Sequence, residues 1–283
     1  MKKIFAFFIS LVILLSLSSV QVFAIDPSID NNENPFDIPE ENYYEFILEN
    51  NDFEDQEFSG ELIEPTYDEN PVFSEDATSI PISSPNGQRG AWLVFDIVEG
   101  SSKKVKATVS SSGSPLFYNN VSIKIYTGTT RSNCNTLAVS STTFKLYGLR
   151  SEYIETNAAT KYFKVGITVD GTTYNQGTAT KLFNKSGRVY PKYTDPRSGI
   201  TVPEPSVSWA KTSPPLVSWS ATNRNSYLQW YERTYCRGIA QNWSGYEVHH
   251  IRPRAYGGTN VNSNLIPLPT NIHSLFTGWF AGY

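Results

Sequence analysis

The middle third of the chain alternates apolar and polar residues with a period of two, and this pattern restricts the folds open to it. The alternation runs through three segments, residues 104–109, 121–125 and 163–169. Successive side chains of a β-strand point to opposite faces, so each segment is predicted to be a strand with one buried face. Asp170-Gly171 follows the third segment and is typical of a two-residue hairpin turn. We therefore expect residues 86–186 to form an all-β sandwich of the immunoglobulin-like kind.

This predicted sandwich contains no histidine and no cluster of chemically reactive side chains. We interpret it as a spacer or binding module, because a fold of this kind does not by itself identify a ligand. Residues 187–222, which follow it, are rich in proline. Proline favours extended chain without regular hydrogen bonding, so we interpret this stretch as a linker to a further domain.

Charge is distributed very unevenly along the chain. Residues 25–80 contain 18 Asp and Glu and no Lys or Arg, whereas residues 81–186 have a net charge of +7 and residues 187–283 a net charge of +5. A segment so acidic would have to bury like charges in order to pack, and we expect residues 25–85 to be largely disordered. It is either a solubilising spacer or, as a sharper hypothesis, a polyanionic pro-segment that contacts the basic domains and inhibits them.

The N-terminus has the pattern of a secretory signal peptide. Lys2 and Lys3 precede an apolar run over residues 4–17, and Val22-Phe23-Ala24 places small residues at a cleavage site. The run is shorter than the roughly 20 residues that cross a bilayer, which favours a cleaved peptide over a membrane anchor. We therefore expect residues 1–24 to be removed near Ala24, and the mature protein to be secreted and free of the membrane.

Two cysteines, Cys134 and Cys236, lie far apart in the sequence. Neither has a second Cys or His at the spacing of a zinc site. Export would allow them to pair as a disulfide, but two thiols define no disulfide pattern. Both the paired and the free state therefore stay open.

The C-terminal residues 223–283 are predicted to form a small α+β domain that contains all three histidines, His249, His250 and His273. Residues 246–250 and 265–268 are expected to be strands, joined by a tight loop with Gly257-Gly258, and a helix is expected to begin at Thr270 as its N-cap. Alternation along the first strand sends His249 and His250 to opposite faces. Two strands crossed by one helix would then bring His249 towards His273.

These residue types suit phosphodiester hydrolysis, which needs an activated water, a cation near the leaving oxygen and neutralised phosphate charge. Neutral imidazoles at His249 and His273 can hold one divalent metal ion. His250, on the other face, stays free to act as a general base. Asn264 can orient that imidazole, either through its side-chain amide or by pinning the loop carbonyl against Nδ1. Two arginines, Arg252 and Arg254, can bind phosphate oxygens through their guanidinium forks, although ordinary solvated arginines are an equal alternative.

Residues 247–283 resemble the HNH (ββα-metal) nuclease superfamily. The shared features are the His-His pair, the Gly-Gly turn, an Asn-Leu-x-Pro-Leu-Pro segment starting at Asn264 and a helical histidine. The resemblance implies cleavage of nucleic acid with one divalent ion, either Mg, Mn, Ni or Zn. By matching positions it makes His249 and His273 metal ligands, His250 the base and Asn264 the orienting residue. Glu247 matches an acidic active-site residue of colicin-type nucleases.

The resemblance covers about 40 residues, and one position departs from it. Colicin-type members have a further metal-binding histidine one helical turn beyond His273, where this chain has Thr277. We therefore expect weaker metal binding rather than loss of activity. DNA is the expected substrate, read through its backbone with little base specificity, while RNA stays open.

Two other functions fit the same residues. The chain is alternatively a secreted binding or adhesive protein whose HNH-like metal site is not catalytic. It is otherwise a nuclease toxin that acts on other cells, a role that a delivery domain or a neighbouring immunity gene would indicate.

Overall fold

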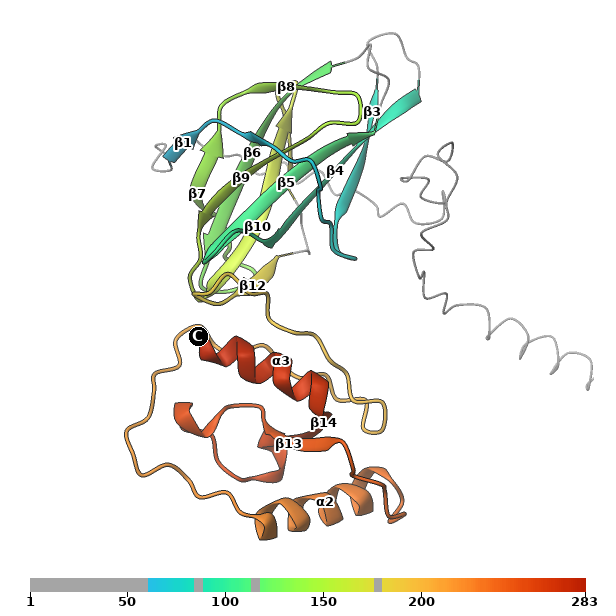
Figure 1. Ribbon diagram of the computed structural model, residues 1–283, viewed down its shortest axis with the longest axis vertical. Helices are drawn as coiled ribbons and strands as arrows, with labels where there is room; N and C mark the ends of the chain where they lie inside the picture. Colours follow the sequence, from blue (N-terminus) through green and yellow to red (C-terminus); the bar gives the residue numbers. More distant parts are fainter. Residues whose placement is uncertain (1–60, 84–88, 113–117, 176–179) are drawn as a thin grey trace, which may run out of the picture. The chain divides into compact units, whose positions relative to one another are not determined.

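The computed structural model describes residues 61–83, 89–112, 118–175 and 180–283 (Figure 1). All of the described residues belong to one compact unit. The predicted signal peptide and the acidic residues up to 60 lie outside the described residues. Among the residues described, no helix is both long enough and apolar enough to span a membrane.

Most of the regular structure in the described chain is β-strand, and the strands up to residue 183 form two sheets, with the described helices near the C-terminus (Figure 1). One sheet has five antiparallel strands. Their spatial order is β2 (Thr66–Tyr67), β9 (Ser151–Asn157), β5 (Lys104–Ser112), β4 (Arg89–Glu99) and β3 (Thr78–Ser83).

The other sheet has seven strands built around β6 and β10. Its main path runs through β1 (Glu61–Ile63), β7 (Thr136–Ser141), β6 (Tyr118–Gly128), β10 (Lys161–Val169) and β11 (Thr172–Asn175). Two further strands extend it, β8 (Phe144–Tyr147) beside β6 and β12 (Lys181–Phe183) beside β10. The pair of β1 with β7 is parallel, whereas the other pairs in this sheet are antiparallel.

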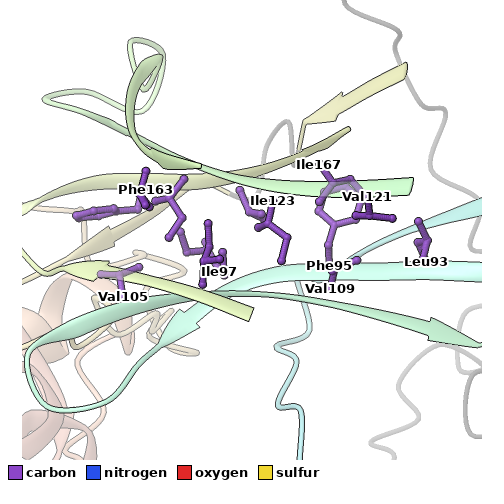
Figure 2. Close-up of a cluster of buried hydrophobic side chains, with 14 of the residues drawn as sticks. Leu93, Phe95, Ile97, Val105, Val109, Val121, Ile123, Phe163 and Ile167 are labelled. Carbon is purple, nitrogen blue, oxygen red and sulfur yellow. The ribbon is translucent and has the colours of Figure 1, made fainter. Parts of the chain in front are cut away.

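The core lies between the two sheets, where their inward-facing side chains meet (Figure 2). Every second residue of β5 and β6 contributes to it, and the members Val105, Ala107, Val109, Val121, Ile123 and Ile125 are each 0% exposed. The predicted alternation is confirmed for its apolar positions, which are buried, while the polar Thr108 between Ala107 and Val109 is also 0% exposed. The described part of the chain is accordingly β-rich.

The predicted hairpin turn at Asp170-Gly171 is also confirmed. It joins β10 to β11 with Val169 paired to Thr172, so the loop has two residues. Both turn residues have positive φ angles, 47° for Asp170 and 87° for Gly171. This conformation matches the twist of the flanking strands, and it explains the Asp-Gly pair at this position.

The expected boundary of the acidic segment at residue 85 is wrong, because residues 61–83 contain the strands β1, β2 and β3. Their carboxylates do not oppose folding, since some stay in solvent and others find cations. Asp68 lies 2.5 Å from Lys106, and Asp76 lies 2.6 Å from Lys192. The hypothesis of an inhibitory acidic segment therefore concerns residues 25–60.

The interpretation of residues 187–222 as a linker needs correction as well. Tyr190 and Val202 are buried in a cluster that also contains Phe276 and Trp279. Asp195 is 0% exposed and accepts a hydrogen bond from the Tyr231 hydroxyl. Proline prevents regular hydrogen bonding but does not prevent packing, so the first half of this stretch belongs to the folded structure.

The C-terminal part contains α2 (Ala221–Tyr235), β13 (Tyr246–His250), β14 (Leu265–Pro269) and α3 (Thr270–Ala281). Two short 3-10 turns, η3 (Arg254–Tyr256) and η4 (Asn262–Asn264), lie between the strands. The two predicted strands and the predicted helix are confirmed, but the expected capping role of Thr270 is wrong. Pro269 is the N-cap, and the Thr270 hydroxyl instead donates to the Gly245 carbonyl at 3.0 Å.

The two cysteines are both free. Cys134 is buried, and burial raises the pKa of its thiol to about 11. The disulfide that the sequence left open is therefore not formed.

Candidate metal and catalytic site

The strand β13 and the helix α3 bring two histidines together. His249 is buried on β13, opposite Ile266 of β14, and His273 lies in the first turn of α3. Their ring centroids are 5.4 Å apart, with 78° between the ring planes. Two imidazoles that bind one ion through nitrogens at about 2.1 Å have centroids about 4.5–5.2 Å apart. The observed separation of 5.4 Å is slightly longer than the upper end of this range.

The buried imidazole of His249 is chemically suited to bind a cation. Its Nε2 is shielded from solvent and has no hydrogen-bond partner among the described residues. Burial, and then the nearby His273 and His250, lower the pKa of His249 to about 3, so the ring is neutral at pH 7. Buried polar atoms nearly always have a partner, and a metal ion would supply one for this lone pair.

The carboxylate of Glu247 fixes the orientation of His273. Its Oε2 lies 3.0 Å from Nδ1 of the imidazole, so Nδ1 is the donor nitrogen and Nε2 is left to bind a cation. Glu247 itself remains half exposed. One helical turn beyond His273, Thr277 is exposed.

The described residues supply few side-chain ligands to such a metal site. Within the described parts of the chain, no group of three or more His, Cys, Asp or Glu side chains is arranged to hold a metal ion. The two imidazoles fit a cation, and water would have to complete its coordination.

The third histidine, His250, lies on the opposite face of β13. Its ring packs edge to face against Trp219 at a centroid distance of 4.7 Å. Its Nε2 is 2.9 Å from Oδ1 of Asn260. Burial lowers the pKa of His250, with a contribution from the positive charge of Arg254, while the Asn260 hydrogen bond opposes the change. The ring is therefore neutral at neutral pH, as a general base must be.

The side chain of Asn264 organises the loop after His250. Its Oδ1 accepts from the backbone N–H of Arg252 at 2.8 Å, and its Nδ2 donates to the carbonyls of Arg252 and Thr259. These contacts pin the loop backbone, but none of them reaches the imidazole of His250. The side chain that meets the His250 ring is that of Asn260 instead.

The Gly-Gly pair makes the tight turn of this loop possible. Gly257 has a φ of 83°, a conformation that glycine adopts without strain. A Cβ atom on Gly258 would lie 1.7 Å from the carbonyl oxygen of Arg252. The first glycine is therefore required by backbone conformation and the second by close packing of the chain.

Both predicted phosphate-binding arginines follow His250 but are engaged within the protein. Nε of Arg252 donates to the Tyr256 carbonyl at 2.6 Å, and its guanidinium lies 5.3 Å from the ring centroid of Trp209. Nη1 of Arg254 donates to the Val217 carbonyl at 2.9 Å. Each guanidinium has five N–H donors, so these contacts position the arginines without using all their donors.

Two residues at the site, Asn260 and Trp219, were missed by reasoning from the sequence. Asn260 lies within a polar loop, and Trp219 is 31 positions before His250 in the proline-rich stretch. No local pattern connects either of them to His250. The neighbourhood of the Gly-Gly turn is the one signal that could have drawn attention to Asn260.

Comparisons with protein-family models, with curated proteins and with solved structures gave no match. His249, His273 and Glu247 lie together on one side of β13, and His250 lies on the other beside Asn260.

Proposed function

We propose that this protein is a secreted, metal-dependent nuclease of the HNH (ββα-metal) type that hydrolyses phosphodiester bonds, with DNA as the expected substrate. The observation that carries the proposal is the buried, unpartnered Nε2 of His249 on a ring that faces His273. A buried imidazole without a partner costs stability unless a ligand satisfies it. A divalent cation is the ligand that two facing imidazoles favour.

The proposed metal ligands and the proposed general base lie on opposite faces of β13. A divalent ion held by His249 and His273 would polarise the phosphate and stabilise the oxygen that leaves. His250 takes a proton from a water molecule as the water oxygen bonds to phosphorus. The bond from phosphorus to the leaving oxygen then breaks, that oxygen takes a proton from solvent water, and the products are a phosphate monoester end and a hydroxyl end.

The remaining residues of the loop support this chemistry. Asn264 holds the loop backbone, and with it the two arginines whose unused donors can meet phosphate oxygens. The net charges of +7 on residues 81–186 and +5 on residues 187–283 favour binding to a polyanion through its backbone. The β-rich part would then serve as an immunoglobulin-like spacer or binding module.

One alternative has observations in its favour. Arg252 and Arg254 donate to backbone carbonyls, and Nε2 of His250 is paired with Asn260, so these groups also suit a purely structural metal site. A secreted binding protein with a non-catalytic site would have the same contacts. Cleavage activity distinguishes the two functions.

The test is a cleavage assay on the purified chain from residue 25, with plasmid DNA and with RNA. We expect cleavage that stops in chelator, returns with one of Mg, Mn, Ni or Zn, and is lost in His250→Ala. Arg233→Ala, an exposed position on α2, is the matched control and should retain activity. The proposal is wrong if no metal supports cleavage of either substrate, or if His250→Ala cleaves as well as the control.

A further inference from the structure

Residues 212–219, which we call the strap, lie along the loop that follows His250. Three hydrogen bonds connect the two segments. They are Thr212 N–H to the Ala255 carbonyl at 2.8 Å, Arg254 Nη1 to the Val217 carbonyl at 2.9 Å, and Asn260 Nδ2 to the Ser218 carbonyl at 2.7 Å. Trp219 at the end of the strap packs against the His250 ring. The strap therefore contacts both the loop and the candidate base.

The end of the strap is held by the start of α2. Ser220 is the N-cap of this helix, and its hydroxyl accepts from the backbone N–H of Asn223 at 3.2 Å. The side chain of Asn223 accepts in return from the backbone N–H of Ser220 at 3.0 Å. This reciprocal cap fixes the chain two residues after Ser218, so the Ser218 carbonyl has a defined direction.

Two hydrogen bonds connect Ser218 to His250 through the side chain of Asn260, and they are compatible with one placement of the hydrogen atoms. A carbonyl oxygen can only accept, so Asn260 must turn its NH2 group towards Ser218. The amide oxygen of Asn260 then faces Nε2 of His250 at 2.9 Å. Because this oxygen also can only accept, Nε2 must carry the hydrogen. A neutral imidazole carries one N–H, so Nδ1 has the lone pair.

We propose that Asn260 is a positioning residue that fixes His250 in the Nε2–H tautomer, so that Nδ1 takes the proton from the attacking water. This inference rests on the nuclease function proposed above. As the O–H bond of water breaks and the N–H bond forms at Nδ1, the imidazole becomes positively charged. The hydrogen bond from Nε2–H to Asn260 then becomes charge-assisted and stabilises that cation.

The tautomer is measured directly by NMR of the ring nitrogens, in chelator at pH 7.5, where no turnover is needed. In the wild-type chain we expect a protonated, hydrogen-bonded Nε2 and a bare Nδ1 at His250. Asn260→Ala should lose the signal of the bonded Nε2–H and gain the other tautomer. Asn260→Asp keeps an acceptor oxygen for Nε2 but loses the donor to Ser218, and it should still keep a proton on Nε2. Asn262→Ala, an exposed change in the same loop, is the matched control.

Kinetics separate positioning from a general effect on folding. We expect Asn260→Ala to lower kcat about tenfold, the equivalent of one hydrogen bond in the transition state, with KM and metal affinity unchanged. Asn260→Asp should keep a higher kcat than Asn260→Ala, because it retains the acceptor for Nε2–H. The inference is overturned if wild-type His250 carries its proton on Nδ1, or if Asn260→Ala and Asn262→Ala give the same spectrum and the same kcat. The expected tautomer without any cleavage would instead contradict the nuclease function and support the tautomer assignment.

Discussion

The buried imidazole of His249 predicts how the stability of the metal-free protein depends on pH. Burial lowers the pKa of His249 from its usual 6.5 to about 3, so the unfolded chain binds a proton that the folded chain excludes. The free energy of unfolding therefore falls as the pH drops below 6.5, and it continues to fall down to about pH 3. This single group should lower the free energy of unfolding by about 2 kcal/mol between pH 7.5 and 5.0. That figure changes little for any folded pKa below about 4.

The assay is urea unfolding in chelator at several pH values, followed by tryptophan fluorescence. Five of the six tryptophans report on the C-terminal part, namely Trp209, Trp219, Trp230, Trp243 and Trp279. The control is His249→Gln, which should remove about 2 kcal/mol of the pH dependence and leave the smaller contribution of His250, whose pKa is also lowered. With three histidines in the chain, each ring can also be titrated individually by NMR. Equal pH dependence in the two proteins, or a His249 ring that titrates near 6.5, would refute the reasoning.

Three further changes test other parts of the structure. In the wild type the ammonium of Lys181 lies 2.6 Å from the buried carboxylate of Asp96. Lys181→Met removes this cation and should lower the free energy of unfolding by about 3 kcal/mol. The control Lys161→Met, at an exposed position, should change it little. Gly258→Ala places a methyl group against the Arg252 carbonyl and should abolish cleavage and destabilise the loop. Gly257→Ala should lower the free energy of unfolding by only about 1 kcal/mol, the cost of a left-handed conformation. Urea unfolding of the two variants distinguishes these effects. Deleting residues 25–60 should raise cleavage activity if the acidic segment is inhibitory, and equal rates with and without it would end that hypothesis.

The strands of the core could be predicted because their signal is local. Val105, Ala107 and Val109 alternate with polar neighbours, and each of the three is fully buried. Alternation also separates His249 from His250 on the first strand of the C-terminal part, although Val248 and His249 are both buried there. For the strands of the core, the apolar face can be found from neighbouring residues alone.

The strands β1 to β3 could not be predicted in the same way. β1 has three residues and pairs in parallel with β7, about 78 positions further along the chain, so its partner leaves no mark on the local sequence. Composition pointed to disorder, yet Asp68 and Asp76 are neutralised by lysines from distant segments. Net charge gives only the sum of the charges in a segment, whereas the stability of the fold depends on which opposite charges lie close together.

The candidate site contains both kinds of contact, those that the local sequence predicts and those that it does not. The pairing of His249 with His273 follows from a strand, a strand and a helix of predictable length. The contact between His250 and Asn260 depends instead on the path of a loop and on a strap that begins near Thr212. Such contacts are set by tertiary structure, and no periodic pattern records them.

The proposed roles of the three histidines, two as metal ligands and one as the general base, can be tested by measuring metal binding and cleavage on the same variants. We expect His250→Ala to bind one divalent ion with wild-type affinity and to cleave no DNA. His249→Ala and His273→Ala should lose both binding and cleavage, because each removes one of the two imidazoles that face the ion. If His250→Ala loses the ion, or if His249→Ala keeps it, the metal does not sit between His249 and His273.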